Sequence, residues 1–118
     1  MKESIVGGKA YLYALRIVPV YRKMIEQKEY IISKQLLRCS TSIGANIEEA
    51  TAACSRRDFI AKMAIASKEA RESRYWIRLI ADSNIIENQD YNELENEIEE
   101  IIRMLTKIVK TSQMERQI

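Results

Sequence analysis

Histidine is absent from this 118-residue chain, and its absence excludes several classes of function. Serine–histidine and cysteine–histidine catalysis both need an imidazole as the general base. Helical bundles that bind two metal ions use Glu-x-x-His pairs, and haem-binding bundles usually use histidine as an axial ligand. None of these sites can be built from this sequence, and we expect no cofactor.

Glycine, proline, cysteine and long apolar runs are also scarce. Three glycines and one proline leave few places for tight turns, which favours a small number of long helices. No stretch reaches the roughly 18 uncharged apolar residues of a membrane span, and the start of the chain has no clear cleavage site. Cys39 and Cys54 lack a C-x-x-C or zinc-ligand pattern. We interpret them as reduced core thiols of a cytoplasmic protein rather than as a disulfide.

Apolar residues that recur at helical spacing divide the chain into four segments of one domain, residues 1–118. The predicted helices are residues 9–27, 31–54, 56–82 and 89–112. The connections between them are short, so consecutive helices should be antiparallel. The sequence therefore predicts an all-α, up-down-up-down four-helix bundle.

Spacing also predicts which side of a helix faces the core. The stripe of the first helix is Tyr11, Ala14, Val18, Tyr21 and Ile25. The stripe of the third helix is Phe59, Met63, Ala66, Ala70, Ser73, Ile77 and Ile80. Pro19 should kink or split the first helix, because it removes one amide donor. Ser55 followed by Asp58 fits a capping box, so the third helix should begin at Arg56.

The third helix carries a second apolar seam, formed by Ile65, Trp76 and Leu79. One bundle cannot easily cover two seams of the same helix. Two interpretations follow: Trp76 packs at the edge of its own bundle, or the seam is a subunit interface.

The stretch "SIGANIEEAT" places small residues inside a helix. Ser40, Gly44 and Thr51 share one face, where a neighbouring helix could approach closely. Asn46 should lie on the core side and would then need a polar partner. We predict a structural polar network of Asn46, Glu49, Glu69 and Glu72, with Arg71 or Lys68 to balance its charge. Catalysis by these carboxylates would require a metal ion that they alone hold, and we expect neither a metal nor an enzyme.

Two stretches, "QLLRCSTSIGANIEEA" and "SRRDFIAKMAIASKEARESRYWIRLI", resemble the bacterial 23S rRNA intervening-sequence protein family, also called four-helix-bundle proteins. The family pattern falls on Ser42, Ile43, Ala45, Asn46, Ile47, Glu49, Ser55, Phe59, Ile65, Ala66 and Glu72. The stretch "EIEEIIRMLTKIV" is similar to the last helix of the family. The chain departs from the pattern at Pro19, which interrupts a usually unbroken helix, and at Ala50, where many members have glycine.

The resemblance implies a four-helix bundle that assembles as a homopentameric ring. The chain is also similar to the accessory protein of diversity-generating retroelements, a basic ring that binds nucleic acid and a reverse transcriptase. Members encoded inside rRNA insertions imply a link to RNA rather than a particular activity.

Charge is distributed unevenly along the chain, although the net charge is only +2. Residues 82–100 contain eight acidic and no basic side chains. Antiparallel packing should gather cations at the other end of the bundle: Arg56, Arg57, Lys62, Lys107, Lys110 and Arg116, near Lys2 and Lys9. The helix dipole explains acid at the start of the last helix, but it disfavours Arg56 and Arg57 at the start of the third. These cations are either a solvated surface or a phosphate-binding site.

The prediction that combines these observations is a non-enzymatic, ring-forming accessory protein that binds RNA or DNA through phosphate contacts. Arg56, Arg57, Lys62, Lys107 and Lys110 would make those contacts. The chain has no RNA-binding signature that would read bases specifically. The alternative is a protein–protein scaffold that holds a partner enzyme, with incidental affinity for nucleic acid.

Overall fold

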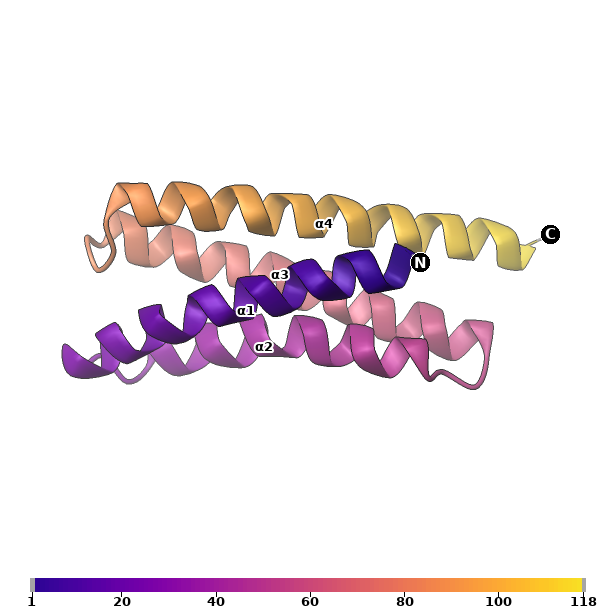
Figure 1. Cartoon of the computed structure of the whole chain (residues 1–118), viewed down its shortest axis with the longest axis horizontal. Coiled ribbons are helices and arrows are strands. Elements are labelled where there is room, and N and C mark those ends of the chain that lie inside the picture. The colour runs from indigo at the N-terminus through magenta and orange to yellow at the C-terminus, as the bar shows by residue number, and fades with distance from the viewer. Residues whose placement is uncertain (1, 118) are drawn as a thin grey trace.

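A computed structural model describes the backbone of residues 2–117 and the side chains of residues 5–115. The chain forms four α-helices, and the described residues contain no strand. The helices are α1 (Lys2–Glu26), α2 (Ile32–Thr51), α3 (Arg56–Asp82) and α4 (Asn88–Gln117). Consecutive helices run antiparallel in a rod of 51 × 22 × 20 Å (Figure 1). The predicted four-helix arrangement is therefore what the chain adopts.

Local capping explains where α2 and α3 begin. The Ser55 side chain accepts a hydrogen bond of 3.0 Å from the backbone N–H of Asp58, so α3 begins at the predicted residue. At the start of α2, the Glu29 carboxylate accepts hydrogen bonds from the N–H groups of Ile31, Ile32 and Ser33. It thus satisfies three amides that have no partner within the helix. The predicted bounds of the other helix ends differ from these by up to several residues, most of all where α1 begins.

Pro19 does not split α1, which is continuous from Lys2 to Glu26. A proline inside a helix leaves the carbonyl four residues earlier without its amide donor. Here that carbonyl belongs to Leu15, and both residues are exposed. Water can hydrogen-bond the carbonyl, which explains why the helix tolerates the proline.

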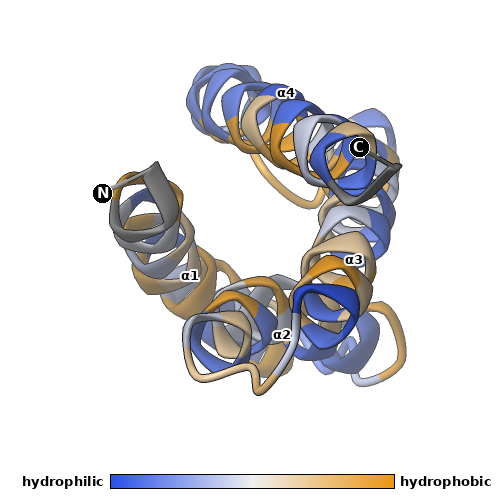
Figure 2. Ribbon diagram, turned by 90° about the vertical axis from the view of Figure 1, so that its right-hand side faces the viewer, coloured by the Kyte–Doolittle hydropathy of each residue, from blue (hydrophilic) through white to orange (hydrophobic). Residues whose placement is uncertain are grey.

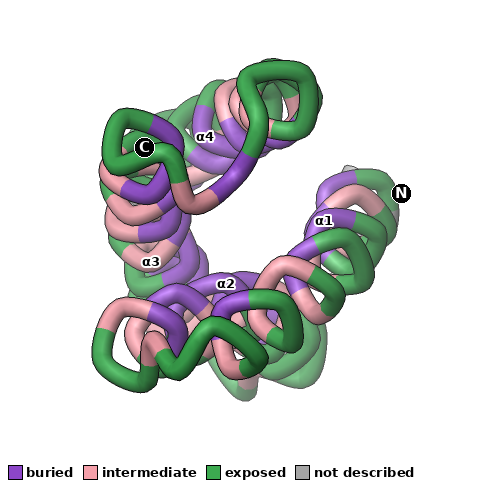
Figure 3. Tube along the Cα trace, turned by 90° about the vertical axis from the view of Figure 1, so that its left-hand side faces the viewer, coloured by how far each residue is buried: buried purple, intermediate pink, exposed green. Residues whose placement is uncertain are grey.

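Buried residues line the inner side of all four helices (Figure 3). The predicted stripe of α3 is buried except for Phe59, which is half-buried beside the buried Ile60. The predicted stripe of α1 is wrong, because Tyr11 is 66 % exposed. The core residues of α1 are Val6, Ala10, Tyr13, Ile17 and Met24. Apolar residues occur on several sides of α1, so spacing alone could not identify its buried side.

The small residues of α2 allow α1 to approach closely. A Cβ added at Gly44 would lie 3.7 Å from the Cβ of Ala10, and one added at Gly7 would lie 3.4 Å from Cγ2 of Ile47. Ser40 is buried, but Thr51 is exposed. The predicted small-residue face therefore contacts α1 at Gly44, whereas Ser40 hydrogen-bonds Ser73 of α3 and Thr51 is exposed.

The helices are arranged in chain order around the bundle, so α1 and α3 are diagonal and α1 also meets α4 (Figure 2). The contact between α1 and α4 is the smallest of the four. At the end that contains the start of α3 and the end of α4, α1 and α4 stand apart (Figure 2). We call this the open end. Among the described residues, no helix has the length and apolar character needed to cross a membrane.

Both cysteines are free thiols, but their surroundings differ. Cys39 is buried, and burial raises the pKa of its thiol to about 12. Cys54 is exposed in the connection between α2 and α3. The prediction of a core thiol therefore holds for Cys39 and is wrong for Cys54, because α2 ends at Thr51 before it reaches that position.

Candidate nucleic-acid interface

The five cations predicted to contact phosphate lie near one end of the bundle. Three come from the start of α3, and Lys107 and Lys110 come from the later part of α4, which the antiparallel arrangement places beside it (Figure 1). The side chains of Lys2 and Arg116, which the sequence assigned to the same end, lie outside the described residues.

Two of these cations already have carboxylate partners. A guanidinium nitrogen of Arg56 lies 2.8 Å from Oε2 of Glu115, and Nζ of Lys62 lies 3.1 Å from Oε1 of Glu49. The other three, Arg57, Lys107 and Lys110, are exposed and form no ion pair within the described part of the chain. These three are the cations that an external anion can reach without first displacing a carboxylate.

The cations face different hollows of the surface. Arg56 and Lys107 line a cavity of about 660 Å³ at the open end, to which all four helices contribute. Lys110 lines a smaller hollow of about 260 Å³ between α3 and α4, together with Arg71. The predicted cations thus surround the end of the bundle and do not form one patch. Arg71 joins the set of cations that an external anion could contact there.

Lys9 does not belong with the cations of the open end, contrary to the prediction. Its Nζ lies 3.1 Å from Oε1 of Glu100, across the contact between α1 and α4. In the same contact, Nε of Arg16 lies 2.7 Å from Oε2 of Glu97. Antiparallel packing places these α1 cations beside the acidic part of α4, which explains why they are neutralised there.

Glu97 is the least well satisfied carboxylate of that contact. Its Oε1 is buried and accepts no hydrogen bond from the described residues, while its Oε2 meets Arg16. Burial raises the pKa of the Glu97 carboxyl, and the neighbouring Arg16 opposes that rise. The fold therefore makes this carboxyl a weaker acid than an ordinary glutamate.

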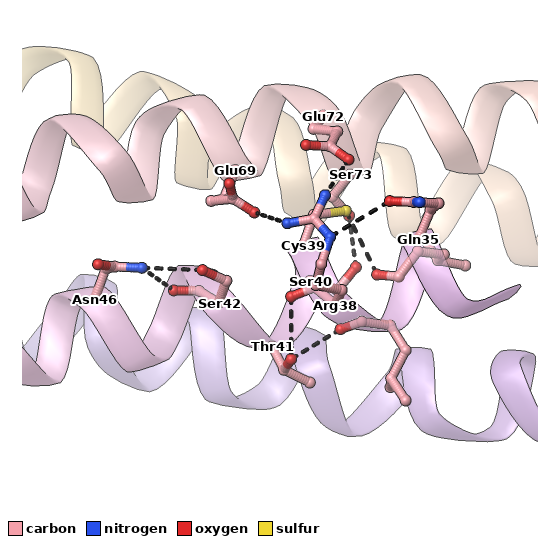
Figure 4. Close-up of polar contacts among 12 residues, drawn as sticks. Gln35, Arg38, Cys39, Ser40, Thr41, Ser42, Asn46, Glu69, Glu72 and Ser73 are labelled. Carbon is pink, nitrogen blue, oxygen red and sulfur yellow. Dashed lines mark hydrogen bonds and ion pairs between the residues drawn. The ribbon is translucent and has the colours of Figure 1, made fainter. Parts of the chain in front are cut away.

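A second polar region lies on the outer face of α2 and α3 (Figure 4). Arg38 on α2 bridges two carboxylates of α3, with 3.1 Å to Glu69 and a shorter contact to Glu72. Nε1 of Trp76 donates a hydrogen bond of 3.0 Å to the Glu72 oxygen that Arg38 also contacts. The hydrogen bond from Trp76 and the Arg38 guanidinium lower the pKa of Glu72 against the effect of partial burial. We call this set the α2–α3 face.

The prediction of one network linking Asn46, Glu49, Glu69 and Glu72 was wrong. Nδ2 of Asn46 donates to the backbone and side-chain oxygens of Ser42, at 2.8 and 2.9 Å, within α2 (Figure 4). Glu49 pairs with Lys62, and the two α3 carboxylates meet Arg38 rather than Arg71 or Lys68. The reason is the rotation of α2 about its own axis. Ile43, Ile47 and Ala50 occupy the core side of α2, which leaves Asn46 half-buried at the flank.

The described side chains contain no group of three or more histidine, cysteine, aspartate or glutamate residues placed to hold a metal ion. The polar contacts at Arg38 instead satisfy one another through ion pairs and the indole N–H. Their geometry is that of a contact between two helices.

Sequence reasoning did not foresee a chain of buried hydroxyl groups. Tyr13 of α1 lies 2.7 Å from Ser73 of α3, which lies 2.8 Å from Ser40 of α2. Burial raises the pKa of Tyr13 above its ordinary range, so the phenol remains protonated and can donate. Ser73 in the predicted α3 stripe was the signal for such a contact, because a serine in a core stripe needs a polar partner.

The predicted subunit-interface residues are only partly accessible. Trp76 packs against the core of its own bundle, which agrees with the edge interpretation, whereas Ile65 is 42 % exposed and Leu79 is half-buried. A larger apolar surface, which the prediction missed, lies on the outside of α1 and is called the α1 stripe. Its residues are Ile5, Tyr11, Leu12 and Leu15, each more than half exposed.

The family of the chain follows from comparison with known proteins. The model of the 23S rRNA-intervening sequence protein family matches residues 2–107. The chain belongs to this family. A crystal structure of a family relative, a protein of unknown function from the S23 ribosomal protein family of Bacteroides thetaiotaomicron, is 46 % identical. The match covers 93 % of this chain and 99 % of that one, with a TM-score of 0.88. No curated protein matches the chain.

Membership in the 23S rRNA-intervening sequence family confirms the resemblance noted in the sequence. The family motif in α2 and α3 includes Asn46, Glu49 and Glu72, of which Glu72 belongs to the α2–α3 face. Two other motif residues, Ser55 and Phe59, line the cavity at the open end. The cavity-lining cations Arg56 and Lys107 are not part of that motif.

Proposed function

We propose that this protein is a non-enzymatic accessory protein of the cytoplasm that assembles as a homopentameric ring and binds RNA or DNA through phosphate contacts at its open end. The observation that carries the proposal is that Arg57, Lys107 and Lys110 have no carboxylate partner among the described residues. Six other described cations do have such partners, namely Lys9, Arg16, Arg38, Arg56, Lys62 and Arg74. Arg22, Lys23 and Lys34 at the opposite end of the bundle have none among the described residues and serve below as the matched control.

An unpaired cation is the kind that can bind phosphate. A guanidinium or ammonium group that already contacts a carboxylate must lose that contact before it gains another. An unpaired, solvated one instead releases the condensed counterions of a nucleic acid when it binds. Arg56 and Arg57 also stand at the start of α3, where the helix dipole disfavours positive charge, so helix stability does not explain them. Five copies in a ring would multiply a weak contact through effective concentration.

The ring is supported by two exposed apolar surfaces on different sides of the bundle. A cyclic assembly places one surface of each subunit against a different surface of the next. The α1 stripe lies on one helix, whereas the exposed Ile65 and the half-buried Leu79 lie on α3, the diagonal helix (Figure 2). Diagonal helices can face neighbours on both sides of a subunit. We propose that these two surfaces meet between subunits.

The assembly is tested by light scattering on the intact protein and on a Leu12→Glu/Leu15→Glu variant. We expect the intact protein to have five times the 13.7 kDa mass of one chain. The variant should have the mass of a single chain while its circular dichroism stays helical, because both leucines are exposed in the bundle. A variant that keeps the full mass would exclude the α1 stripe as the interface.

Phosphate binding is tested by fluorescence anisotropy with an RNA hairpin and a DNA duplex of unrelated sequence, between about 50 and 200 mM salt. We expect binding that weakens steeply with salt and that is largely lost in an Arg57→Gln/Lys107→Gln/Lys110→Gln variant. The matched control removes three exposed cations from the opposite end, as Arg22→Gln/Lys23→Gln/Lys34→Gln. An equal loss in the control would show that overall charge, rather than the open end, causes binding.

The second candidate function is a protein scaffold whose ring holds a partner enzyme, with incidental affinity for nucleic acid. The α1 stripe is the observation that favours it, since an exposed apolar surface of this kind marks a protein contact. If the assembled protein keeps its mass in the leucine variant and binds no nucleic acid at the lowest salt, the scaffold becomes the better account.

A further inference from the structure

We propose that the cavity at the open end binds one unstacked base of a single-stranded nucleic acid, while Lys107 and Arg56 at its rim contact the adjacent phosphate. This inference rests on the proposed function and adds to it the class of nucleic acid that the open end selects. All four helices contribute residues to this cavity, and it lies at the end where the ribbons of α1 and α4 stand apart (Figure 2).

The cavity has the size and walls of a small-molecule site. Its volume of about 660 Å³ is within the range of pockets that enclose small ligands. Half-buried Phe59, Met104 and Ile108 supply apolar surface from α3 and α4. Phe59 is the aromatic side chain among the lining residues, and an aromatic ring can stack on any base.

Hydroxyl groups are set into these apolar walls. Thr51, Ser55, Thr111 and Ser112 all line the cavity. Ser112 is the least exposed of the four, at 5 %. A ligand with hydrogen-bond donors and acceptors can bind these hydroxyl groups in place of the water that would otherwise contact them. The polar edge of a base offers such atoms, whereas a purely apolar ligand does not.

Charge at the rim favours a ligand with a negative group outside the cavity. Arg56 and Lys107 line the cavity together with Glu115, and Arg57 follows Arg56 in α3. Glu115 holds Arg56 at 2.8 Å, so Lys107 is the cation that can meet a phosphate first. A nucleotide has the matching division, with a flat base on one side and a phosphate on the other.

A duplex cannot place a base in this cavity. Its bases are paired and stacked, so only its phosphates are presented to the rim. The bases of a single strand can turn outward and stack on an aromatic side chain. Phosphate contacts alone favour a duplex, because its charge density is higher, and they do not distinguish a single strand from an abasic strand with the same phosphates. Insertion of a base adds affinity only for the single strand that has bases.

The test compares three probes by fluorescence anisotropy on the intact protein at one low salt concentration. They are a single-stranded thymidine oligonucleotide of about twelve residues, an abasic strand with the same number of phosphates, and the corresponding duplex. We expect the strand with bases to bind about tenfold more tightly than the abasic strand, since stacking contributes that order of affinity. Phe59→Leu, which keeps the apolar volume, should remove this difference and leave abasic binding unchanged. Ser112→Ala should reduce the difference in the same way.

The outcomes separate this inference from the proposed function. Equal binding of the strand with bases and the abasic strand, or a preference unchanged in both Phe59→Leu and Ser112→Ala, would overturn base insertion while phosphate binding stood. No binding of any probe at the lowest salt would overturn both. Circular dichroism of each variant shows that it is folded, and Lys107→Gln should weaken the abasic and normal strands alike.

Discussion

The α2–α3 face and the open end both carry basic side chains, but these differ in whether a carboxylate of the same chain contacts them. On the α2–α3 face, Arg38 is held by Glu69 and Glu72, and the indole of Trp76 completes the set. At the open end, Arg57 and Lys107 are exposed without a carboxylate partner in the described structure. The partner of a cation, rather than the number of cations, thus distinguishes a contact that stabilises the bundle from one that is free to bind something else.

The residues of the family motif occur in both regions. Glu72 belongs to a contact between helices that the fold itself satisfies. Ser55 and Phe59 line the cavity of the open end, whose cations Arg56 and Lys107 lie outside the motif. We therefore expect changes on the α2–α3 face to affect stability and changes at the open end to affect binding.

The largest effect should come from the hydroxyl chain beneath the α2–α3 face. Ser73→Ala leaves the buried hydroxyls of Tyr13 and Ser40 without their shared partner. The free energy of unfolding should fall by about 1–3 kcal/mol, measured by urea denaturation. Tyr13→Phe, which keeps the contact between the two serines, should cost less. A larger loss in Tyr13→Phe than in Ser73→Ala would contradict the assignment of Ser73 as the central member.

Removing the cation of the α2–α3 face should have the next largest effect on stability. Arg38→Met leaves Glu69 and Glu72 without a counter-charge, and we expect a loss of about 1 kcal/mol because the pairs are partly exposed. Nucleic-acid affinity should be unchanged. For stability the control is Arg71→Met, since Arg71 donates to the hydroxyl of Thr106 and forms no carboxylate pair in the described residues. If Arg38→Met weakens nucleic-acid binding as strongly as Lys107→Gln, the comparison fails.

Releasing a paired cation at the open end should raise affinity. Glu115→Gln frees Arg56 and removes a negative charge from the cavity rim, so nucleic-acid binding should tighten about threefold and its salt dependence should steepen. Stability should change by less than about 0.5 kcal/mol, because the pair is exposed. Glu99→Gln, which frees Arg74 in the middle of the bundle, should leave affinity unchanged if position matters more than total charge.

The smallest effect is a difference in pH dependence between Glu72 and Glu97. The pKa of Glu72 is below its ordinary 4.5, so its ionised form stabilises the fold, and that contribution is lost as pH falls below about 4.5. The pKa of Glu97 is raised, so its ionisation costs stability, and that cost disappears as pH falls from neutrality through its folded-state pKa. On acidification, Glu72→Gln should lose less stability than the unaltered protein and Glu97→Gln should lose more. Urea midpoints across the acid range measure both, and the same response in the two variants would refute the assignment.

Much of the fold could be predicted because the relevant signals are local. The start of α3 follows from Ser55 and Asp58, and its core stripe follows from regular spacing. The buried side of α1 could not be predicted, because apolar residues on its other sides form the α1 stripe. Only the packing of α1 against α2 and α4 determines which of its apolar residues are buried and which form the α1 stripe.

The candidate site was predictable only in part, for a related reason. Antiparallel packing identified the end of the bundle at which the cations lie. It could not identify that Arg56 meets Glu115 and that Lys62 meets Glu49, because such pairs depend on the rotation and register of neighbouring helices. The cavity depends on the separation of α1 from α4, which no local sequence signal encodes.

The order of the helices around the bundle also has a consequence for how the chain folds. Three of the four helix contacts join neighbours in the sequence, and only the smallest, between α1 and α4, joins the two ends of the chain. Such a topology has a low contact order, which is associated with fast folding. The hairpins of adjacent helices can form first, and closure of α1 against α4 follows. We infer that the last contact to form during folding borders the open end, so its geometry is set at the final step.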